Sequence, residues 1–126
     1  MCGIVGYVGK DERCVEVLME GLRNLEYRGY DSAGLALQLD GHLETIKKPG
    51  RLGNLAEALE ERNGHLSHSR TGVGHTRWAT HGRPTEANAH PQLGSGGAVA
   101  VVHNGIIENF SELKEELEER GVAFSS

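Results

Sequence analysis

Apolar residues follow two different periods along the chain, and each period predicts a different kind of element. Short apolar runs and alternation predict strands over residues 4–8, 33–39, 42–48, 71–77 and 98–103, the last of which should be a buried strand. Spacing of three and four residues predicts helices over residues 11–26, 52–62 and 109–120. This order predicts a layered α/β domain whose hairpins make much of the sheet antiparallel.

Small polar residues and glycines mark the ends of several predicted elements. Asp11 stands near the N-cap of the first helix. Asp40 and Gly41 form a pair typical of a tight hairpin turn. Asn63 and Gly64 should end the second helix. These signals set the predicted boundaries to within a few residues.

The strand over residues 71–77 differs between its two faces. His75 and Arg77 share one face, whereas Gly72 and Gly74 leave the other face bare for close packing. Residues 78–97 then form a long loop. Within a small domain, a loop of this length is more often a functional lid than a plain connection.

Composition and charge exclude two classes of partner. Acidic residues outnumber basic ones by 18 to 13 among the 126 residues, the net charge is -5, and no basic run exceeds two residues, so we expect no nucleic-acid partner. The longest apolar run, residues 98–102, is too short to cross a bilayer, and the N-terminus lacks a signal-peptide pattern. We therefore expect a cytoplasmic protein with no membrane partner.

Cysteine usage directs attention to the second residue. Only Cys2 and Cys14 occur, and Cys14 falls inside a predicted helix, so no disulfide is expected. If Met1 is removed, Cys2 carries a thiol and an α-amino group together. Reference pKa values of about 8.5 for a thiol and about 7.7 to 8.0 for an α-amino group allow the amine to take the thiol proton near neutral pH. Cys2 is thus a candidate nucleophile with its own base, and the alternative is a small apolar residue that starts a strand.

The Asn104-Gly105 pair has two interpretations. Asn-Gly between apolar runs usually predicts a hairpin, but too few residues separate the pair from the helix cap expected at Asn109. Asn109 and Glu112 have the spacing of a capping box, and Gly121 should close that helix. If the chain bends at residues 104–105 for another reason, the Asn104 amide and the Gly105 N–H can form the two donors of an oxyanion hole.

Five motifs along the chain closely resemble the N-terminal glutaminase domain of the glucosamine-6-phosphate synthases, the isomerising glutamine–fructose-6-phosphate aminotransferases. They are MCGIVG at residues 1–6, YRGYDSAG at 27–34, GHTRWATHG at 74–82, NAHP at 88–91 and VHNGIIEN at 102–109. Sister glutamine amidotransferases share the Cys-Gly start and the Asn-Gly pair, but resemble the second and third motifs less well. The glutaminase domain of such a sister enzyme remains an alternative.

The resemblance implies a fold and a reaction. The fold is the four-layer αββα sandwich of N-terminal nucleophile hydrolases, here truncated on its C-terminal side. In the reaction, Cys2 attacks the side-chain amide of L-glutamine, ammonia leaves, and water hydrolyses the glutamyl thioester to glutamate. The full enzyme uses that ammonia to aminate fructose 6-phosphate in an isomerase domain, a step of amino sugar (hexosamine) biosynthesis.

The resemblance also assigns roles to particular residues. Asn104 and Gly105 match the oxyanion-hole positions that serve Cys2. Arg77 matches the residue that binds the glutamine α-carboxylate, a role that suits a guanidinium able to form a bidentate pair. A surface ion pair is the alternative for Arg77. Trp78 matches a gate between the glutamine site and the ammonia passage.

Four further positions match the substrate site. Thr80 and His81 match substrate-binding positions in a mobile glutamine loop. Arg28 and Gly29 match residues close to the nucleophile, with a less definite role.

The seven histidines raise an alternative from another class, a metal-binding module. His65 and His68 could act with a third ligand such as His75, but no cysteine cluster supports a zinc site, so we expect no metal and no cofactor. We interpret His75, His90 and His103 as structural polar groups. A regulatory domain that keeps the fold without the chemistry is a further alternative.

The chain stops before the acidic residue that holds the glutamine α-amino group in the resembling enzymes. We therefore expect residues 1–126 to be the incomplete N-terminal part of a type 2 glutamine amidotransferase domain, without the isomerase domain. The expected consequence is that this chain alone hydrolyses glutamine poorly. The full enzyme is expected to be a homo-oligomer.

Overall fold

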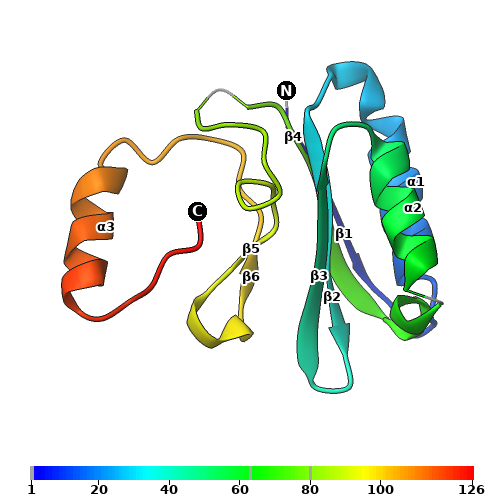
Figure 1. Ribbon diagram of the computed structural model, residues 1–126. Helices are drawn as coiled ribbons and strands as arrows, with labels where there is room; N and C mark the ends of the chain where they lie inside the picture. The colour runs from blue at the N-terminus through cyan, green and yellow to red at the C-terminus, as the bar shows by residue number, and fades with distance from the viewer. Residues whose placement is uncertain (1, 63, 80) are drawn as a thin grey trace.

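A computed structural model describes residues 2–62, 64–79 and 81–126, without the side chains of Arg28 and Ser95. Its main feature is a four-stranded antiparallel sheet in the order β1-β4-β2-β3 (Figure 1). The strands are β1 (Gly3–Val8), β2 (Ser32–Leu39), β3 (His42–Pro49) and β4 (Thr71–Arg77). The predicted antiparallel hairpin turn at Asp40 and Gly41 is confirmed, and both residues have positive φ.

Two helices cover one face of this sheet, α1 (Cys14–Asn24) and α2 (Leu52–Glu61) (Figure 1). Short 3₁₀ turns, η1 (Glu26–Arg28) and η2 (His65–His68), follow them. The helix stripes and β2 form the hydrophobic core between these layers. Its most deeply buried members are Cys14, Leu18, Leu22, Leu35, Leu37 and Leu55.

The glycines of β4 allow α1 to approach the sheet closely, as the sequence predicts. A Cβ added to Gly72 would lie 2.8 Å from a methyl carbon of Leu37 and 3.0 Å from the Cys14 sulfur. A Cβ added to Gly74 would lie 3.0 Å from Leu35. The bare face of β4 is therefore filled by core side chains from the neighbouring strand and from α1.

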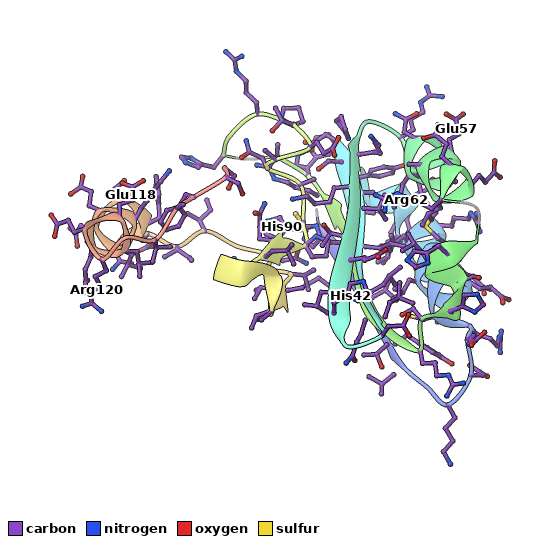
Figure 2. The ribbon with its side chains drawn as sticks, turned by 60° about the horizontal axis from the view of Figure 1, so that its bottom comes forward. His42, Glu57, Arg62, His90, Glu118 and Arg120 are labelled. Carbon is purple, nitrogen blue, oxygen red and sulfur yellow. The ribbon has the colours of Figure 1, made fainter. Side chains whose placement is uncertain are left out.

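The opposite face of the sheet is covered by the loop after β4 and by a two-stranded hairpin. The hairpin pairs β5 (Gln92–Leu93) with β6 (Ala100–Val101), and η3 (Ser95–Gly97) lies between them. Ala89 and Pro91 are buried in this layer. Figure 2 shows His90 between the hairpin and the sheet.

The last helix, α3 (Phe110–Glu119), lies away from the sheet and beyond the hairpin (Figure 1). None of its residues is buried. Figure 2 shows Glu118 of this helix, and Arg120 directly after it, well apart from the sheet. Along one direction the described layers are therefore two helices, a sheet, a small hairpin and a helix. No helix among the described residues is long and apolar enough to cross a membrane.

The predicted N-cap of the first helix is wrong. The helix begins at Cys14 with Arg13 at the N-cap, and no side chain caps it. The carboxylate of Asp11 instead accepts a hydrogen bond from the Tyr7 hydroxyl, which raises the pKa of that phenol. A nearby tyrosine therefore takes the carboxylate that the sequence assigned to the helix.

The strand predicted over residues 98–103 is wrong in both length and burial. Only Ala100 and Val101 pair, and Val99 and Val101 are 58% and 53% exposed. A continuous apolar run predicts a strand covered on both faces, whereas β6 pairs only with the two-residue β5, which itself lies inside the predicted loop.

The predicted start of the third helix is also only partly right. α3 begins after Asn109, but the Asn109 side chain makes no cap hydrogen bond, so the capping box with Glu112 does not form. Its backbone, at φ -97° and ψ 31°, lacks the extended conformation that an N-cap side chain requires. Gly121 has φ +88° after the helix end, as predicted. Of the pair expected to end α2, Gly64 is left-handed, and Asn63 lies outside the described residues.

Candidate functional site

Cys2 lies just before β1, where that strand starts beside the end of β4. Gly3 pairs with Thr76 across the two strands. The Trp78 backbone N–H donates to the Cys2 sulfur at 3.3 Å, and the thiol lies 3.8 Å from the Trp78 carbonyl oxygen. The side chain is partly buried rather than enclosed. The thiol is therefore fixed against the first residue of the long loop and remains open to a substrate.

Asn104 is brought beside Cys2 from the far end of the sequence. Its Nδ2 donates to the Cys2 carbonyl oxygen at 3.2 Å. Its Oδ1 lies 2.7 Å from Nε2 of His75. Gly105 follows directly and lies against the neighbouring imidazole, since an added Cβ would be 3.1 Å from the His103 ring. The chain bends at Gly105, the condition set for an oxyanion hole here, and no returning strand follows among residues 106–126.

Arg77 ends β4 with its side chain turned inward, only 8% exposed. One guanidinium nitrogen, Nη1, donates to the Arg83 carbonyl oxygen at 3.1 Å, and Nη2 donates to the His81 carbonyl oxygen. The surface ion pair considered from the sequence is therefore wrong, because the described partners of Arg77 are backbone carbonyls. A guanidinium has five N–H donors, so donors remain for an anionic ligand.

Trp78 and Gly29 pack against each other next to the thiol. Gly29 has φ +77°, a left-handed conformation that favours glycine. A Cβ added there would also lie 3.2 Å from the Trp78 ring. The indole is 50% exposed, so Trp78 is not a core residue.

The remaining predicted positions are less closely placed. His81 is exposed, and its ring meets that of Phe110 edge-on with centroids 5.1 Å apart. Thr80 and the Arg28 side chain lie outside the described residues.

Asp31 shapes the site, although the sequence reasoning did not single it out. Its Oδ2 accepts a hydrogen bond of 2.5 Å from the Ala79 N–H, and its own N–H donates to the Arg77 carbonyl oxygen at 2.7 Å. It thus fixes the chain on both sides of Trp78. The available signal was an acidic residue directly before β2, whose first residue pairs with Arg77.

Two stacked imidazoles lie beneath Asn104. The rings of His75 and His90 have centroids 4.5 Å apart. Burial lowers the pKa of His75, and burial with the nearby His75 lowers that of His90 to about 4. Both rings are therefore neutral near pH 7, which agrees with the structural role expected for them.

The three-histidine metal site considered from the sequence does not come together. His65 bonds Glu44 and His68 bonds Glu12, whereas His75 lies on the opposite face of the sheet. Across residues 2–62, 64–79 and 81–126, no group of three or more potential ligands is placed to hold a metal ion. A hollow of about 500 Å³ is lined by these two exposed histidines and the turn at Asp40, and Cys2 is not among its lining residues.

Comparison with known proteins now places the chain in a family. Residues 41–126 match the model of the glutamine amidotransferase domain. The chain belongs to this family. It is 61% identical over 121 residues to an isomerising glutamine–fructose-6-phosphate aminotransferase of Streptomyces coelicolor, covering 96% of this chain and 19% of that protein. It is 57% identical to the Mycobacterium bovis enzyme of the same name over 126 residues, all of this chain and 20% of that one.

The fold also matches solved amidotransferase structures. The glutamine phosphoribosylpyrophosphate amidotransferase of B. subtilis aligns with a TM-score of 0.72 at 29% identity, over 98% of this chain and 26% of that one. A structure described as the allosteric regulatory enzyme of purine biosynthesis aligns with a TM-score of 0.74, also at 29% identity and with the same coverage. The predicted mixed α/β fold of the N-terminal nucleophile amidotransferases is thus confirmed.

Proposed function

We propose that this chain is the N-terminal part of the glutaminase domain of an isomerising glutamine–fructose-6-phosphate aminotransferase. The chain spans about a fifth of the length of the curated relatives it matches. The observation that carries the proposal is the meeting of Cys2 and Asn104, a candidate nucleophile and a candidate oxyanion donor separated by 102 positions in the sequence. The high identity to enzymes of that name supports the choice of reaction.

In the proposed reaction, removal of Met1 frees the α-amino group of Cys2. This amine takes the thiol proton, and the sulfur attacks the side-chain carbonyl carbon of L-glutamine. The carbonyl oxygen becomes an oxyanion that accepts hydrogen bonds from Nδ2 of Asn104 and the N–H of Gly105. Collapse of this intermediate breaks the C–N bond, and the α-amino group of Cys2 passes its proton to the leaving nitrogen, which departs as ammonia. Water then attacks the glutamyl thioester and releases glutamate and the free thiol.

The loop after β4 supplies substrate binding in this proposal. Arg77 pairs with the glutamine α-carboxylate through the donors that its loop carbonyls leave free. Trp78 covers the thiol and gates the passage of ammonia, supported by Gly29 beneath it. Thr80 and His81 bind substrate as the loop closes. Arg28 contributes beside the nucleophile.

Several parts of the proposal concern the whole protein. Ammonia aminates fructose 6-phosphate in an isomerase domain, in a cytoplasmic homo-oligomeric enzyme of amino sugar biosynthesis. An acidic residue outside this chain holds the α-amino group of glutamine. Both ends of glutamine need a partner, because a substrate held at one end can turn its amide away from Cys2.

Comparison of Cys2→Ala with Cys14→Ala in the complete gene product tests the proposal. Cys14 is the matched control, a fully buried core residue whose thiol pKa is raised by burial. Cys2→Ala should lower glutamate release by roughly 10³-fold or more, whereas Cys14→Ala should keep the rate. A Cys2→Ala protein that still releases glutamate at the normal rate would contradict the proposed nucleophile.

The acceptor is tested separately by adding fructose 6-phosphate to the unmodified protein. Formation of glucosamine 6-phosphate together with glutamate is the expected result. Glutamate release with no amino sugar formed would keep the glutaminase and exclude this acceptor. The chain would then belong to a sister amidotransferase, the class that the solved structures represent.

A further inference from the structure

We propose that His75 is a positioning residue, whose Nε2–H donates to Oδ1 of Asn104 and so turns the amide nitrogen of Asn104 toward Cys2. This inference rests on the proposed glutaminase function and adds to it the device that orients the oxyanion donor. It also changes the interpretation of His75 from a structural polar group to a residue that acts on the rate.

The Asn104 side chain needs such a device because its own segment is exposed. Residues 103–109 are all exposed and form neither helix nor strand. Among the described residues, the Asn104 side chain has two hydrogen-bond partners, the Cys2 carbonyl oxygen and the His75 ring. One partner belongs to the candidate nucleophile itself, so the ring is the fixed support.

The sheet and a neighbouring ring hold His75 in place. It is fully buried, and its backbone pairs with Ile4 of β1 on one side and with Gly34 of β2 on the other. The ring of His90 stacks on it with centroids 4.5 Å apart. The strand pairings therefore fix the backbone that carries the ring, and the imidazole cannot turn without disturbing its stacked neighbour.

The loop that carries His90 is itself pressed onto the sheet. Ala89 and Pro91 are buried on either side of it. A Cβ added to Gly34 would lie 2.2 Å from the His90 carbonyl oxygen, so only glycine permits this approach. The NAHP segment at residues 88–91 thus acts as a backing for the His75 ring.

The surroundings of His75 define which nitrogen carries the proton. Oδ1 of Asn104 can only accept, so Nε2 must donate. Nδ1 is buried and has no partner among the described residues, which agrees with a nitrogen that carries no hydrogen. The groups that face the ring are His90, Arg77, Asn104 and His103, the last with its backbone as well as its ring. Burial lowers the pKa of His75 and outweighs the hydrogen bonding to Asn104 and to the His103 backbone, which raises it, so the ring is neutral. A neutral ring with hydrogen on Nε2 satisfies the contact with Asn104.

The hydrogen bond has a direct consequence for the reaction. With Oδ1 bound to His75, both hydrogens of Nδ2 lie on the side of Cys2, and one of them bonds the Cys2 carbonyl oxygen. The other is free for the oxyanion that forms on glutamine. A flipped amide would present an oxygen to that negative charge, so loss of His75 should lower the rate and leave glutamine binding nearly unchanged.

Three variants of the complete gene product test this role. His75→Phe keeps a flat ring for stacking but removes the donor, and kcat should fall roughly tenfold to a hundredfold with KM for glutamine changed less than about twofold. His75→Gln restores an N–H donor and should recover most of kcat. His90→Phe is the matched control, which keeps the stack and the bond to Asn104, and its kcat should stay within about threefold of the reference. Equal losses in His75→Gln and His75→Phe, or a loss confined to KM, would overturn the proposal.

A second measurement needs no variant to remain active. Solid-state 15N spectra of the complete protein with labelled histidine, assigned by the signal missing from His75→Gln, report which ring nitrogen carries hydrogen. We expect protonated Nε2 and bare Nδ1 at pH 7, and hydrogen on Nδ1 alone would overturn the proposal even if the variants are inactive. Absence of glutaminase activity in the unmodified protein would instead contradict the proposed function, while the tautomer would still be measured.

Discussion

The part of the chain up to Arg77 and the part after residue 98 have similar apolar patterns and bury them very differently. In the first part, the apolar stripes of α1 and α2 pack against β2 and β4, and residues such as Leu18, Leu35 and Leu55 are fully buried. In the second part, the apolar stripe of α3 stays open. Phe110, Leu113 and Leu117 are 43%, 41% and 39% exposed.

This difference shows that forming a helix and burying its apolar face are separate properties, which the spacing of apolar residues does not distinguish. A three-to-four-residue spacing predicts that a helix forms, and it is right for α1, α2 and α3. Burial also needs an apolar face opposite the helix, which β2 and β4 provide for α1 and α2. The second part is nevertheless functional in our account, because the contacts of Asn104 with His75 and Cys2 tie it to the packed part.

The largest expected effect contrasts core and surface leucines. Leu35→Ala removes a fully buried side chain and should lower the free energy of unfolding by about 2 to 5 kcal/mol. Leu117→Ala, on the exposed stripe of α3, should change it by about 0.5 kcal/mol or less. Urea denaturation of the two variants measures both values, and equal losses would show that α3 is packed against a partner.

Asn104→Ala should have the opposite profile, a large effect on rate and little effect on stability. The glutaminase kcat of the complete protein should fall by about two to three orders of magnitude, the usual loss for one oxyanion donor. Asn104 is exposed, so the thermal midpoint should hardly move. Normal turnover with a raised KM would place Asn104 in substrate recognition instead.

A smaller effect concerns pH and the stacked histidines. The pKa of His90 falls from an ordinary value of 6.5 to about 4 on folding, chiefly through burial. The unfolded chain therefore binds a proton that the folded chain does not, so stability is complete above pH 6.5 and is lost as the pH falls toward 4, by about 3 kcal/mol. His90→Phe should reduce this slope in thermal denaturation curves measured between pH 7 and pH 4.

His42 provides the control for the pH experiment. It is exposed, and its hydrogen bond to Glu44 raises its pKa. The contribution of His42 to the free energy of unfolding therefore depends on pH in the opposite sense. It is present below the unfolded pKa and is lost as the pH rises through the folded pKa. His42→Asn should leave the loss of stability on acidification in place. If the loss of stability on acidification persisted in His90→Phe and disappeared in His42→Asn, its assignment to His90 would be contradicted.

The sequence predicted the packed part of the fold better than the open part. Strand 71–77 and the turn at Asp40 follow from glycine placement and alternation, which are local signals. The prediction of a buried strand over residues 98–103 was wrong. A continuous apolar run is typical of a strand covered on both faces, whereas β6 pairs only with the two-residue β5. The predicted N-cap role of Asp11 was wrong for a related reason, because its carboxylate accepts a hydrogen bond from Tyr7 of β1 instead.

The candidate site shows the same division. Cys2, Asn104 and Arg77 could be named from residue chemistry and motif spacing. The bonds of Asp31 to the chain around Trp78, and the contact of His75 with Asn104, depend on strand register and on the path of the loop. No period or spacing in the sequence contains that information.

The central claim, that Cys2 is an N-terminal nucleophile for glutamine, is tested most directly by covalent trapping. The complete protein is incubated with a glutamine analogue that carries an electrophilic carbon in place of the side-chain amide, and its peptides are examined by mass spectrometry. Our account predicts one adduct on a peptide that begins with Cys2, with Cys14 unmodified as the internal control. An adduct on Cys14, an adduct on a peptide that retains Met1, or no adduct in a protein that releases glutamate would contradict it.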